Sequence, residues 1–511
     1  MKKKLTTGKV WCFAVGQFGW SVLAALISSW LVNYYQPDRS ALKSGQPIFI
    51  PQGLAILGVL TVLGAITAFC RIFDAVTDPL IASLSDRCKS KAGRRIPFMR
   101  IAAIPFALAC ILTFWSPFQG TQVKVPETPV AAVEETVAAE AGEAEAVLEE
   151  TEAVVEEEAV AETASGISEE ETEKAILSAG SWGNAAFLFV MLLLFYLFMT
   201  MYCTPYNALI PELGADQQTR MNISTAISFT YIAGMAVAYL APVIWGFLEG
   251  FMDRVMAIRC TFTGMALIGM ICMFVPVFTI REKDYVQVVP SESTAFKSLA
   301  ATFKNHDFRV FVASDIAYFL GITMFQTALP FFVTSLLKLD EGMSTIYFVL
   351  MTALSIIFYV PINKLTPKFG KKKLILLAFC IFTLSFVFTA FFGSMLPIPA
   401  AIQGFILCVL ASPAQAIFGI LPQAVVADIA ECDALRTKEN RSGMFYAART
   451  FAFKLGQSIA MLLVTAFATI GQDTGLGYRI TAIAAAAVCI LGGVLFMLYD
   501  EKKVYAEIMK P

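Results

Sequence analysis

Two aspartates four residues apart, Asp74 and Asp78, lie in a long apolar segment, "CRIFDAVTDPLIASLSDR". Residues at i and i+4 share one helix face, so the two carboxylates are expected side by side. Pro79 cannot donate a hydrogen bond to the carbonyl of Ala75, which leaves that oxygen free beside the pair. With the hydroxyl of Thr77, these oxygens suit a hard monovalent cation. They suit a proton equally, because neighbouring carboxylates favour protonation of one of them.

Acidic residues within a membrane are expensive, and this supports a functional role for the pair. A carboxylate at the centre of a bilayer costs about 2.5–3.5 kcal/mol on insertion scales, so such residues are functional candidates by default. The alternative is a structural ion pair with Arg71, one turn earlier. An internal repeat between the two halves of the chain aligns Asp74 with Met351 and Asp78 with Ser355, so the second half lacks the aspartate pair. One coupling site per chain is therefore expected.

The surrounding sequence is that of an α-helical membrane protein. Of the 511 residues, 57% are hydrophobic and 15% are charged, whereas soluble domains have about 45–50% and about 25%. A hydrocarbon core about 30 Å thick needs roughly 20 apolar residues per helix, and we expect twelve spans. They run roughly over 10–34, 54–84, 97–118, 185–212, 223–249, 255–280, 308–337, 342–366, 373–395, 398–430, 443–470 and 477–499.

Basic residues and an acidic insert predict the orientation. Lys and Arg follow spans 2, 8, 10 and 12, so both termini are expected in the cytoplasm of a multi-pass inner-membrane protein. The insert at 119–182 then lies outside. Between Lys124 and Lys174 it has 17 glutamates and no basic residue, which predicts a disordered spacer. A role in attracting cations or binding a partner is the alternative.

The loops after spans 2 and 8 repeat one another. "DRCKSKAGRR" at 86–95 aligns with "NKLTPKFGKK" at 363–372, with Gly93 opposite Gly370. This spacing indicates two six-helix halves related by duplication, and the loop pattern resembles that of the major facilitator superfamily. The eleven cysteines form no C-x-x-C pair and His306 is the only histidine. No cofactor or Cys/His metal site is therefore expected besides the coupling ion, Na⁺ or H⁺.

Three stretches resemble the glycoside–pentoside–hexuronide:cation symporters, the melibiose-permease family of that superfamily. They are "RIFDAVTDPLIASLSDRCKSKAGRRIPF", "TPYNALIPELGADQQTR" and "VVADIAECDALRTKENRSGMFYAARTFAFKLGQSIA". The resemblance implies a Na⁺, Li⁺ or H⁺ site built from Asp74, Asp78, Thr77 and Thr200. Lys454 matches a lysine near that site, and a plain interior salt bridge is its alternative role.

The expected solute site departs from that family. Ser21 and Cys203 stand where the family's melibiose permease has sugar-binding aspartates, and Asn207 replaces a sugar-stacking tryptophan. A galactoside is therefore not expected. The candidate solute-binding residues, each of which could instead serve packing, are Gln17, Trp20, Ser21, Cys203, Tyr206, Asn207, Asp315, Tyr318 and Gln326.

A cytoplasmic gate is expected at the ends of spans 2, 10 and 11. A solvated helix end is the alternative for the residues of spans 10 and 11. Its candidate residues are Asp86, Arg87, Arg94, Arg95, Asp428, Glu431 and Arg449. The expected organisation is an N-terminal bundle interrupted by the insert, a middle loop, a C-terminal bundle and a tail. The N-terminal bundle covers 1–118 and 183–280, and the insert covers 119–182. The middle loop covers 281–306, the C-terminal bundle 307–500 and the tail 501–511.

The expected function is symport of a sugar, glycoside or uronate with a cation by alternating access. A transporter of a lysophospholipid-like or other amphipathic solute is the alternative, and a non-transporting receptor is a further one. An enzyme is not expected, because the chain has one histidine and no D-x-D or H-x-x-x-H loop. The expected partners are a small solute and the lipid bilayer. No nucleic acid or obligate protein partner is expected, and the chain is expected to be monomeric.

The orientation can be tested with cysteines introduced by mutation. Cysteines placed at 130–160 should react with an impermeant reagent added outside intact cells, because the insert is expected outside. Cysteines at 436–441 should stay protected in the same experiment. The reverse pattern would turn the assigned orientation around.

Overall fold

The computed structural model describes most of the chain, and every structural statement below concerns these residues. They are 5–54, 56, 60–88, 90, 92–123, 169–213, 217–285, 302–393, 395–437, 442–471 and 474–508.

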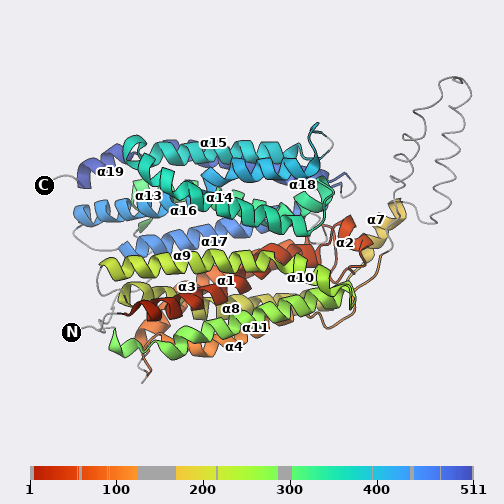
Figure 1. Ribbon diagram of the computed structural model, residues 1–511, viewed down its shortest axis with the longest axis horizontal. Helices are drawn as coiled ribbons and strands as arrows, with labels where there is room; N and C mark the ends of the chain where they lie inside the picture. The colour runs from red at the N-terminus through yellow and green to blue at the C-terminus, as the bar shows by residue number, and fades with distance from the viewer. Residues whose placement is uncertain are drawn as a thin grey trace, which may run out of the picture.

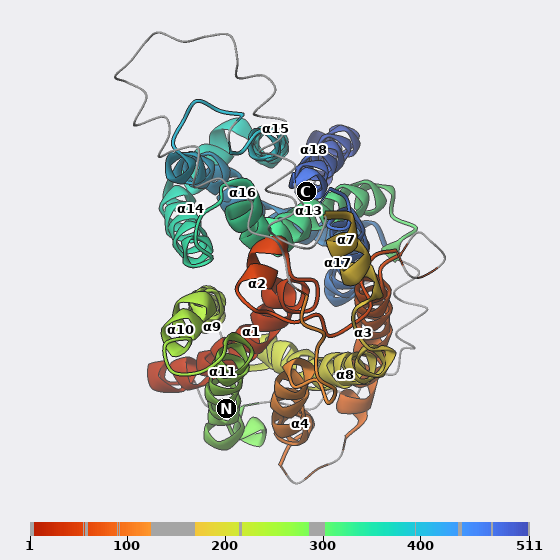
Figure 2. The same cartoon turned by 90° about the vertical axis from the view of Figure 1, so that its right-hand side faces the viewer.

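Long helices run side by side along the molecule in two groups (Figures 1 and 2). The first group comprises α1 (Thr7–Tyr35), α3 (Val62–Arg87), α4 (Ile96–Phe114), α8 (Trp182–Leu213), α9 (Gln217–Tyr239) with α10 (Ala241–Leu248), and α11 (Arg254–Thr279). The second comprises α13 (His306–Phe331) with the π-turn η2 (Phe332–Leu336), α14 (Gly342–Phe369), α15 (Lys371–Ala390), α16 (Ala400–Thr437), α17 (Ser442–Phe467) and α18 (Leu476–Met497). The shorter helices are α2 (Arg39–Lys43), α7 (Glu169–Ser178), η1 (Glu282–Asp284) and α19 (Glu501–Ile508).

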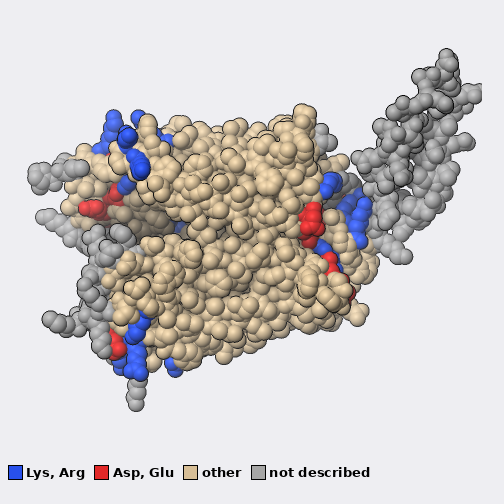
Figure 3. Space-filling view, in the orientation of Figure 1, with Lys and Arg blue, Asp and Glu red and all other residues tan. Residues whose placement is uncertain are grey.

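This arrangement confirms the predicted all-α fold of two six-helix bundles. Eleven of the described spans are long and apolar enough to cross a membrane. Helix α3 is the twelfth long helix. It falls outside that set because Arg71, Asp74 and Asp78 lie within one membrane length, yet it packs between α8 and α17. On the face shown in Figure 3, Lys, Arg, Asp and Glu gather at the two ends of the molecule and leave a belt without them in between.

Two predicted spans differ in detail from the helices observed. The span expected at 54–84 begins at Val62, where the Thr61 side chain accepts a hydrogen bond from the Gly64 N–H at 3.0 Å. Such a cap satisfies an otherwise free donor of the first turn. The span expected at 223–249 is divided into α9 and α10, because Pro242 lies at the start of α10 and cannot continue the hydrogen bonding of α9.

Matching acidic caps extend the internal repeat beyond the loops. The main-chain N–H groups of residues 94 and 95 each donate to Glu282 at 2.9 Å. Those of residues 371 and 372 donate to Glu501 at 2.7 and 3.1 Å. Helix N-termini favour an anion. Each glutamate follows the last long helix of its half and caps the third, so it ties the two together.

The two glycines of the repeat make room for these caps. Gly93 has a φ of +118° and Gly370 a φ of +82°, conformations that L-residues with a side chain rarely adopt. A Cβ at Gly93 would lie 2.2 Å from an oxygen of Glu282, and one at Gly370 would lie 2.8 Å from an oxygen of Glu501. The repeated glycines therefore serve close approach as well as the turn.

The C-terminal part of the predicted insert is folded. Helix α7 buries Ile176, and that residue joins Ala179, one residue of α2 and residues of two loops in a small apolar cluster. Gly180 follows with a φ of +93°, and a Cβ there would lie 2.3 Å from the Ile50 carbonyl. The prediction of a disordered spacer over 119–182 therefore does not hold for residues 169–182. Residues 124–168 lie outside the described residues.

Replacing residues 125–168 by a short Gly/Ser linker should leave transport within a few-fold of wild type. A longer or shorter external loop changes the closure entropy only slightly. A replacement that extends through Ser178 should instead lower the midpoint of thermal unfolding, because it uncovers the apolar cluster under α7. Uptake and membrane expression are measured for both. Loss of uptake by the shorter replacement at normal expression would show that the segment has a specific role.

Candidate functional site

The predicted aspartate pair lies where α3 of the first half meets α17 of the second. The Lys454 ammonium from α17 contacts Oδ2 of Asp74 at 2.9 Å and Oδ2 of Asp78 at 2.6 Å. The i, i+4 spacing thus places both carboxylates on one face, as predicted. Lys454 forms the interior salt bridge that was one of its two expected roles. This contact joins the two bundles.

Two hydroxyls on α8 bind the other oxygen of each carboxylate. Thr200 donates to Oδ1 of Asp74 at 2.6 Å, and Thr204 donates to Oδ1 of Asp78 at 3.1 Å. Thr200 was expected here, whereas sequence reasoning missed Thr204. Its position four residues after Thr200, matching the spacing of the aspartates, is the signal that could have found it.

Two further residues expected at the pair point elsewhere. The Thr77 hydroxyl donates to the main-chain carbonyl of Asp74 at 3.0 Å, rather than to a carboxylate. The Arg71 guanidinium lies over the ring of Tyr196, 4.8 Å from its centroid. Among the described ion pairs, Arg71 contacts neither aspartate. Lys454 therefore supplies the counter-charge that Arg71 was expected to supply.

The three charged groups in direct contact carry one net negative charge in a poorly solvated place. Asp74 is fully buried, whereas the Asp78 side chain is 22% exposed and that of Lys454 is 9% exposed. Buried charges are tolerated only when paired and hydrogen-bonded. The cluster is thus one positive charge short of neutrality, and a monovalent cation or a proton would supply it.

A second buried ion pair holds α17 to its own half. Arg449 contacts Asp315 of α13 through two hydrogen bonds, of 2.6 and 3.0 Å. Both side chains are buried. Asp315 was predicted to bind solute and Arg449 to form a gate. In the structure they bind one another, which satisfies both oxygens of the carboxylate.

The other predicted gate residues do not gather into one network within the described part of the chain. Asp428 pairs with Lys371 at the start of α15, and Glu431 is exposed. Arg94 and Arg95 bind Glu282 through their main-chain N–H groups. The side chains at 86 and 87 lie outside the described residues.

The predicted solute-binding residues divide by their contacts. Ser21 donates to the Phe18 carbonyl, Tyr206 donates to the Phe13 carbonyl, and Tyr318 stacks on a phenylalanine, while Gln17 is buried. These positions serve packing in this conformation. The candidates that keep an exposed or partly exposed side chain are Trp20, Cys203, Asn207 and Gln326.

The end of the molecule that carries α7 is closed by contacts between the halves, which sequence reasoning missed. Arg254 of α11 contacts Glu341, the N-cap of α14, at 2.8 Å. Asp38 accepts hydrogen bonds from Thr334 at 2.6 Å and Ser335 at 2.7 Å. Burial raises the pKa of the Glu341 carboxyl, and the nearby Arg254 opposes the rise. A hollow between the halves opens at the opposite end, where both termini lie (Figures 1 and 3).

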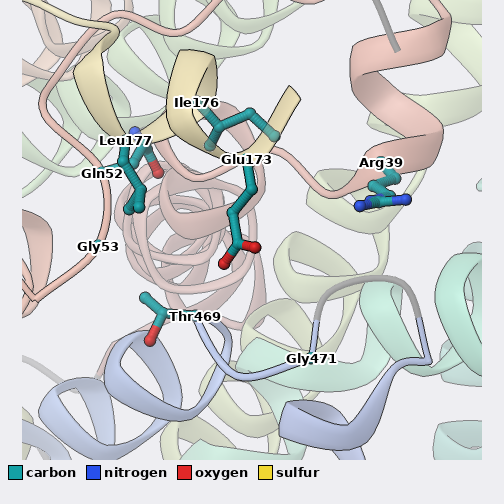
Figure 4. A pocket seen from close by; sticks show the side chains of 8 residues that line it. All are labelled: Arg39, Gln52, Gly53, Glu173, Ile176, Leu177, Thr469 and Gly471. Carbon is teal, nitrogen blue, oxygen red and sulfur yellow. The ribbon is translucent and has the colours of Figure 1, made fainter. Parts of the chain in front are cut away.

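A small pocket of about 100 Å³ lies at this closed end, under α7 (Figure 4). It is lined by residues of α7, of the loop before α3, and of the turn after α17. Glu173 of α7 points into the space beside Thr469, with Arg39 opposite. Both halves and α7 therefore meet around one pocket, and Figure 2 shows α7 in front of α17 at this end.

Comparison with known proteins adds a family to this geometry. The family model described as "MFS/sugar transport protein" matches residues 12–130 and 175–500. A stretch of 64 residues is 41% identical to the "Putative glycoside/cation symporter YagG" of Escherichia coli (strain K12). It covers 12% of this chain and only 14% of that protein. The "Uncharacterized symporter sll1374" of Synechocystis is 20% identical over 88% of this chain and 83% of its own.

Solved transporters share the fold at low identity. The nucleoside transporter NupG has a TM-score of 0.58 at 12% identity, covering 99% of both chains. The xylose transporter XylE from E. coli, in a partially occluded inward-open conformation, has a TM-score of 0.56 at 14% identity. It covers 97% of this chain and 98% of its own. These likenesses concern the architecture alone.

The contact between Arg254 and Glu341 should help to hold the α7 end closed. Glu341→Gln removes the carboxylate that Arg254 contacts across the interface. A cysteine introduced by Thr327→Cys, at a position buried between the halves, should then react several-fold faster with an impermeant maleimide. Glu249→Gln is the matched control, because Glu249 contacts Arg254 within one half at 2.9 Å. Equal labelling rates in Glu341→Gln and Glu249→Gln would show that the contact between Arg254 and Glu341 does not hold this end closed.

Proposed function

Because the chain belongs to the glycoside–pentoside–hexuronide:cation symporter family of the major facilitator superfamily, we propose that it couples inward movement of a monovalent cation, Na⁺ or H⁺, to uptake of a sugar, glycoside or uronate. The observation that carries the proposal is the buried group of two aspartates and one lysine between the halves. A site that lacks one positive charge has a physical reason to take up one cation per cycle.

The cation acts through Lys454. In the structure the ammonium holds Oδ2 of Asp74 and Asp78, the oxygens that an incoming cation would bind. A cation at the pair competes with the ammonium and weakens the contact between α3 and α17. Coupling follows by linkage, since an ion and a solute that favour the same arrangement of the halves increase one another's affinity.

The solute class is proposed from the family description and from the remaining candidates. Trp20 has an indole N–H without a hydrogen-bond partner among the described residues, and Asn207 is exposed. Uncharged donors, acceptors and an aromatic face suit the hydroxyls and apolar faces of a sugar ring. A lysophospholipid-like solute or a receptor role has no comparable support in the family match.

We propose that the chain is a monomer in the cell inner membrane with both termini in the cytoplasm. The distribution of Lys and Arg between alternate loops supports the orientation. The hollow at the end with the termini would then face the cytoplasm, and the end closed by Arg254 and Glu341 would face outward. This conformation would release solute inward.

Asp74→Asn and Asp78→Asn should each abolish cation-driven accumulation of solute, while exchange without a gradient survives. The amide keeps the shape and removes the charge that the cation needs. Each variant leaves one carboxylate for Lys454 and removes a burial cost of about 2.5–3.5 kcal/mol, so both should express at least as well as wild type. If Na⁺ is the ion, it should raise the unfolding temperature of wild type and leave both variants unmoved.

Asp253→Asn is the control, because Asp253 caps α11 through a hydrogen bond to the Met256 N–H and asparagine caps equally well. Uptake is measured in vesicles with an imposed Na⁺ or pH gradient. Accumulation against a gradient by both variants at 74 and 78 would refute coupling at this site.

A further inference from the structure

Two hydrogen bonds with matching spacing link α8 to α3. Asp74 and Asp78 are four residues apart on α3, and Thr200 and Thr204 are four residues apart on α8. Each threonine donates to Oδ1 of one aspartate, at 2.6 and 3.1 Å. The aspartates and the threonines each have the helical spacing that keeps a pair on one face, so the two hydrogen bonds lie one helical turn apart.

The second oxygens of the carboxylates meet a single positive charge. The Lys454 ammonium lies 2.9 and 2.6 Å from Oδ2 of Asp74 and Asp78. Asp74 is fully buried, so its Oδ2 depends on this ammonium for its counter-charge. The ammonium thus marks a point where one monovalent charge contacts both carboxylates.

The chemistry of these ligands favours a small hard cation. Carboxylate and hydroxyl oxygens are the ligands that hard cations prefer. The two carboxylates and the Lys454 ammonium together carry one net negative charge, which matches a monovalent rather than a divalent ion. Two carboxylates and two hydroxyls offer six oxygens, which is more than a proton can use.

Thr204 holds the more accessible of the two carboxylates. The Asp78 side chain is 22% exposed and that of Asp74 is fully buried, so an arriving ion meets Asp78 first. A threonine hydroxyl carries one donor and two acceptor lone pairs. It can therefore orient Asp78 by donation and offer a lone pair to a bound metal ion. A proton needs only one carboxylate oxygen and gains little from that hydroxyl.

We propose that Thr204 is an additional determinant of the cation site, and that its hydroxyl favours Na⁺ or Li⁺ over a proton. This inference rests on the proposed cation coupling at Asp74 and Asp78. It adds the class of the ion and a residue that sets it. Thr77, whose hydroxyl is bound to a main-chain carbonyl, does not fill this role in the structure.

The test is a Na⁺ titration of thermal unfolding of the purified full-length protein, with choline replacing Na⁺ at constant ionic strength. Wild type should show a saturable shift. Thr204→Val should raise the Na⁺ concentration at half-saturation by about tenfold or more, because a hydrogen bond to a charged group is lost. Thr204→Ser keeps the hydroxyl and should stay within about twofold of wild type. If Thr204→Val does not fold, Thr204→Ala removes the same hydroxyl with less crowding.

Thr67→Val is the matched control on α3, since the Thr67 hydroxyl donates to carbonyls of its own helix. The second measurement is uptake driven by a pH gradient without Na⁺, which Thr204→Val should retain or increase. The inference falls if Thr204→Val titrates like wild type. It also falls if wild type shows no Na⁺ shift while Asp74→Asn still abolishes proton-driven accumulation, a result that leaves the proposed coupling intact. Accumulation by Asp74→Asn would instead refute the coupling itself.

Discussion

Burying two carboxylates between helices in a membrane is the constraint on which the rest of the structure depends. Such charges persist only with an opposite charge and hydrogen-bond donors close by. Here the donors come from α8 in the same half, and the opposite charge comes from Lys454 in the other half. The first half therefore cannot satisfy its own acids. Any ion that does so in place of Lys454 changes what holds the halves together.

Helix α17 is placed to convert this change into movement because it is anchored on two sides. Arg449 fixes it to α13 of its own half through two hydrogen bonds. Lys454 fixes it to α3, and the Ser458 hydroxyl donates to the Ala68 carbonyl of the same helix at 3.0 Å. The Arg449 pair is internally balanced and needs no ion, whereas the Lys454 group lacks one positive charge. Under the proposed coupling, ion binding would therefore act selectively on the contact between the halves.

The parts predictable from sequence were those set by short-range geometry. Apolar run length gave the long helices, and i, i+4 spacing placed Asp74 beside Asp78. Closeness in sequence suggested that the Thr77 hydroxyl would contact the aspartate pair, and the structure shows otherwise. The hydroxyl reaches the main-chain carbonyl of Asp74, three residues earlier in its own helix, more readily than a carboxylate. Thr204 could have been found from its position four residues after Thr200, once Thr200 was expected beside Asp74. The pairing of Asp315 with Arg449 depends on how distant helices meet, and no local pattern carries that information. For Lys454 only a family resemblance indicated the place.

The internal repeat separates the mechanical parts of the molecule from the chemical one. Glu282 and Glu501 cap corresponding helices in both halves, and each ties the last long helix of its half to the third. Each bundle is thereby held as a unit by the same device. The aspartate pair is not duplicated, since Met351 and Ser355 occupy the corresponding positions. In the proposed mechanism, two similarly braced bodies share this charge-deficient contact, and among the described contacts it is where an ion would bias their relative position. Alternating access requires such a bias.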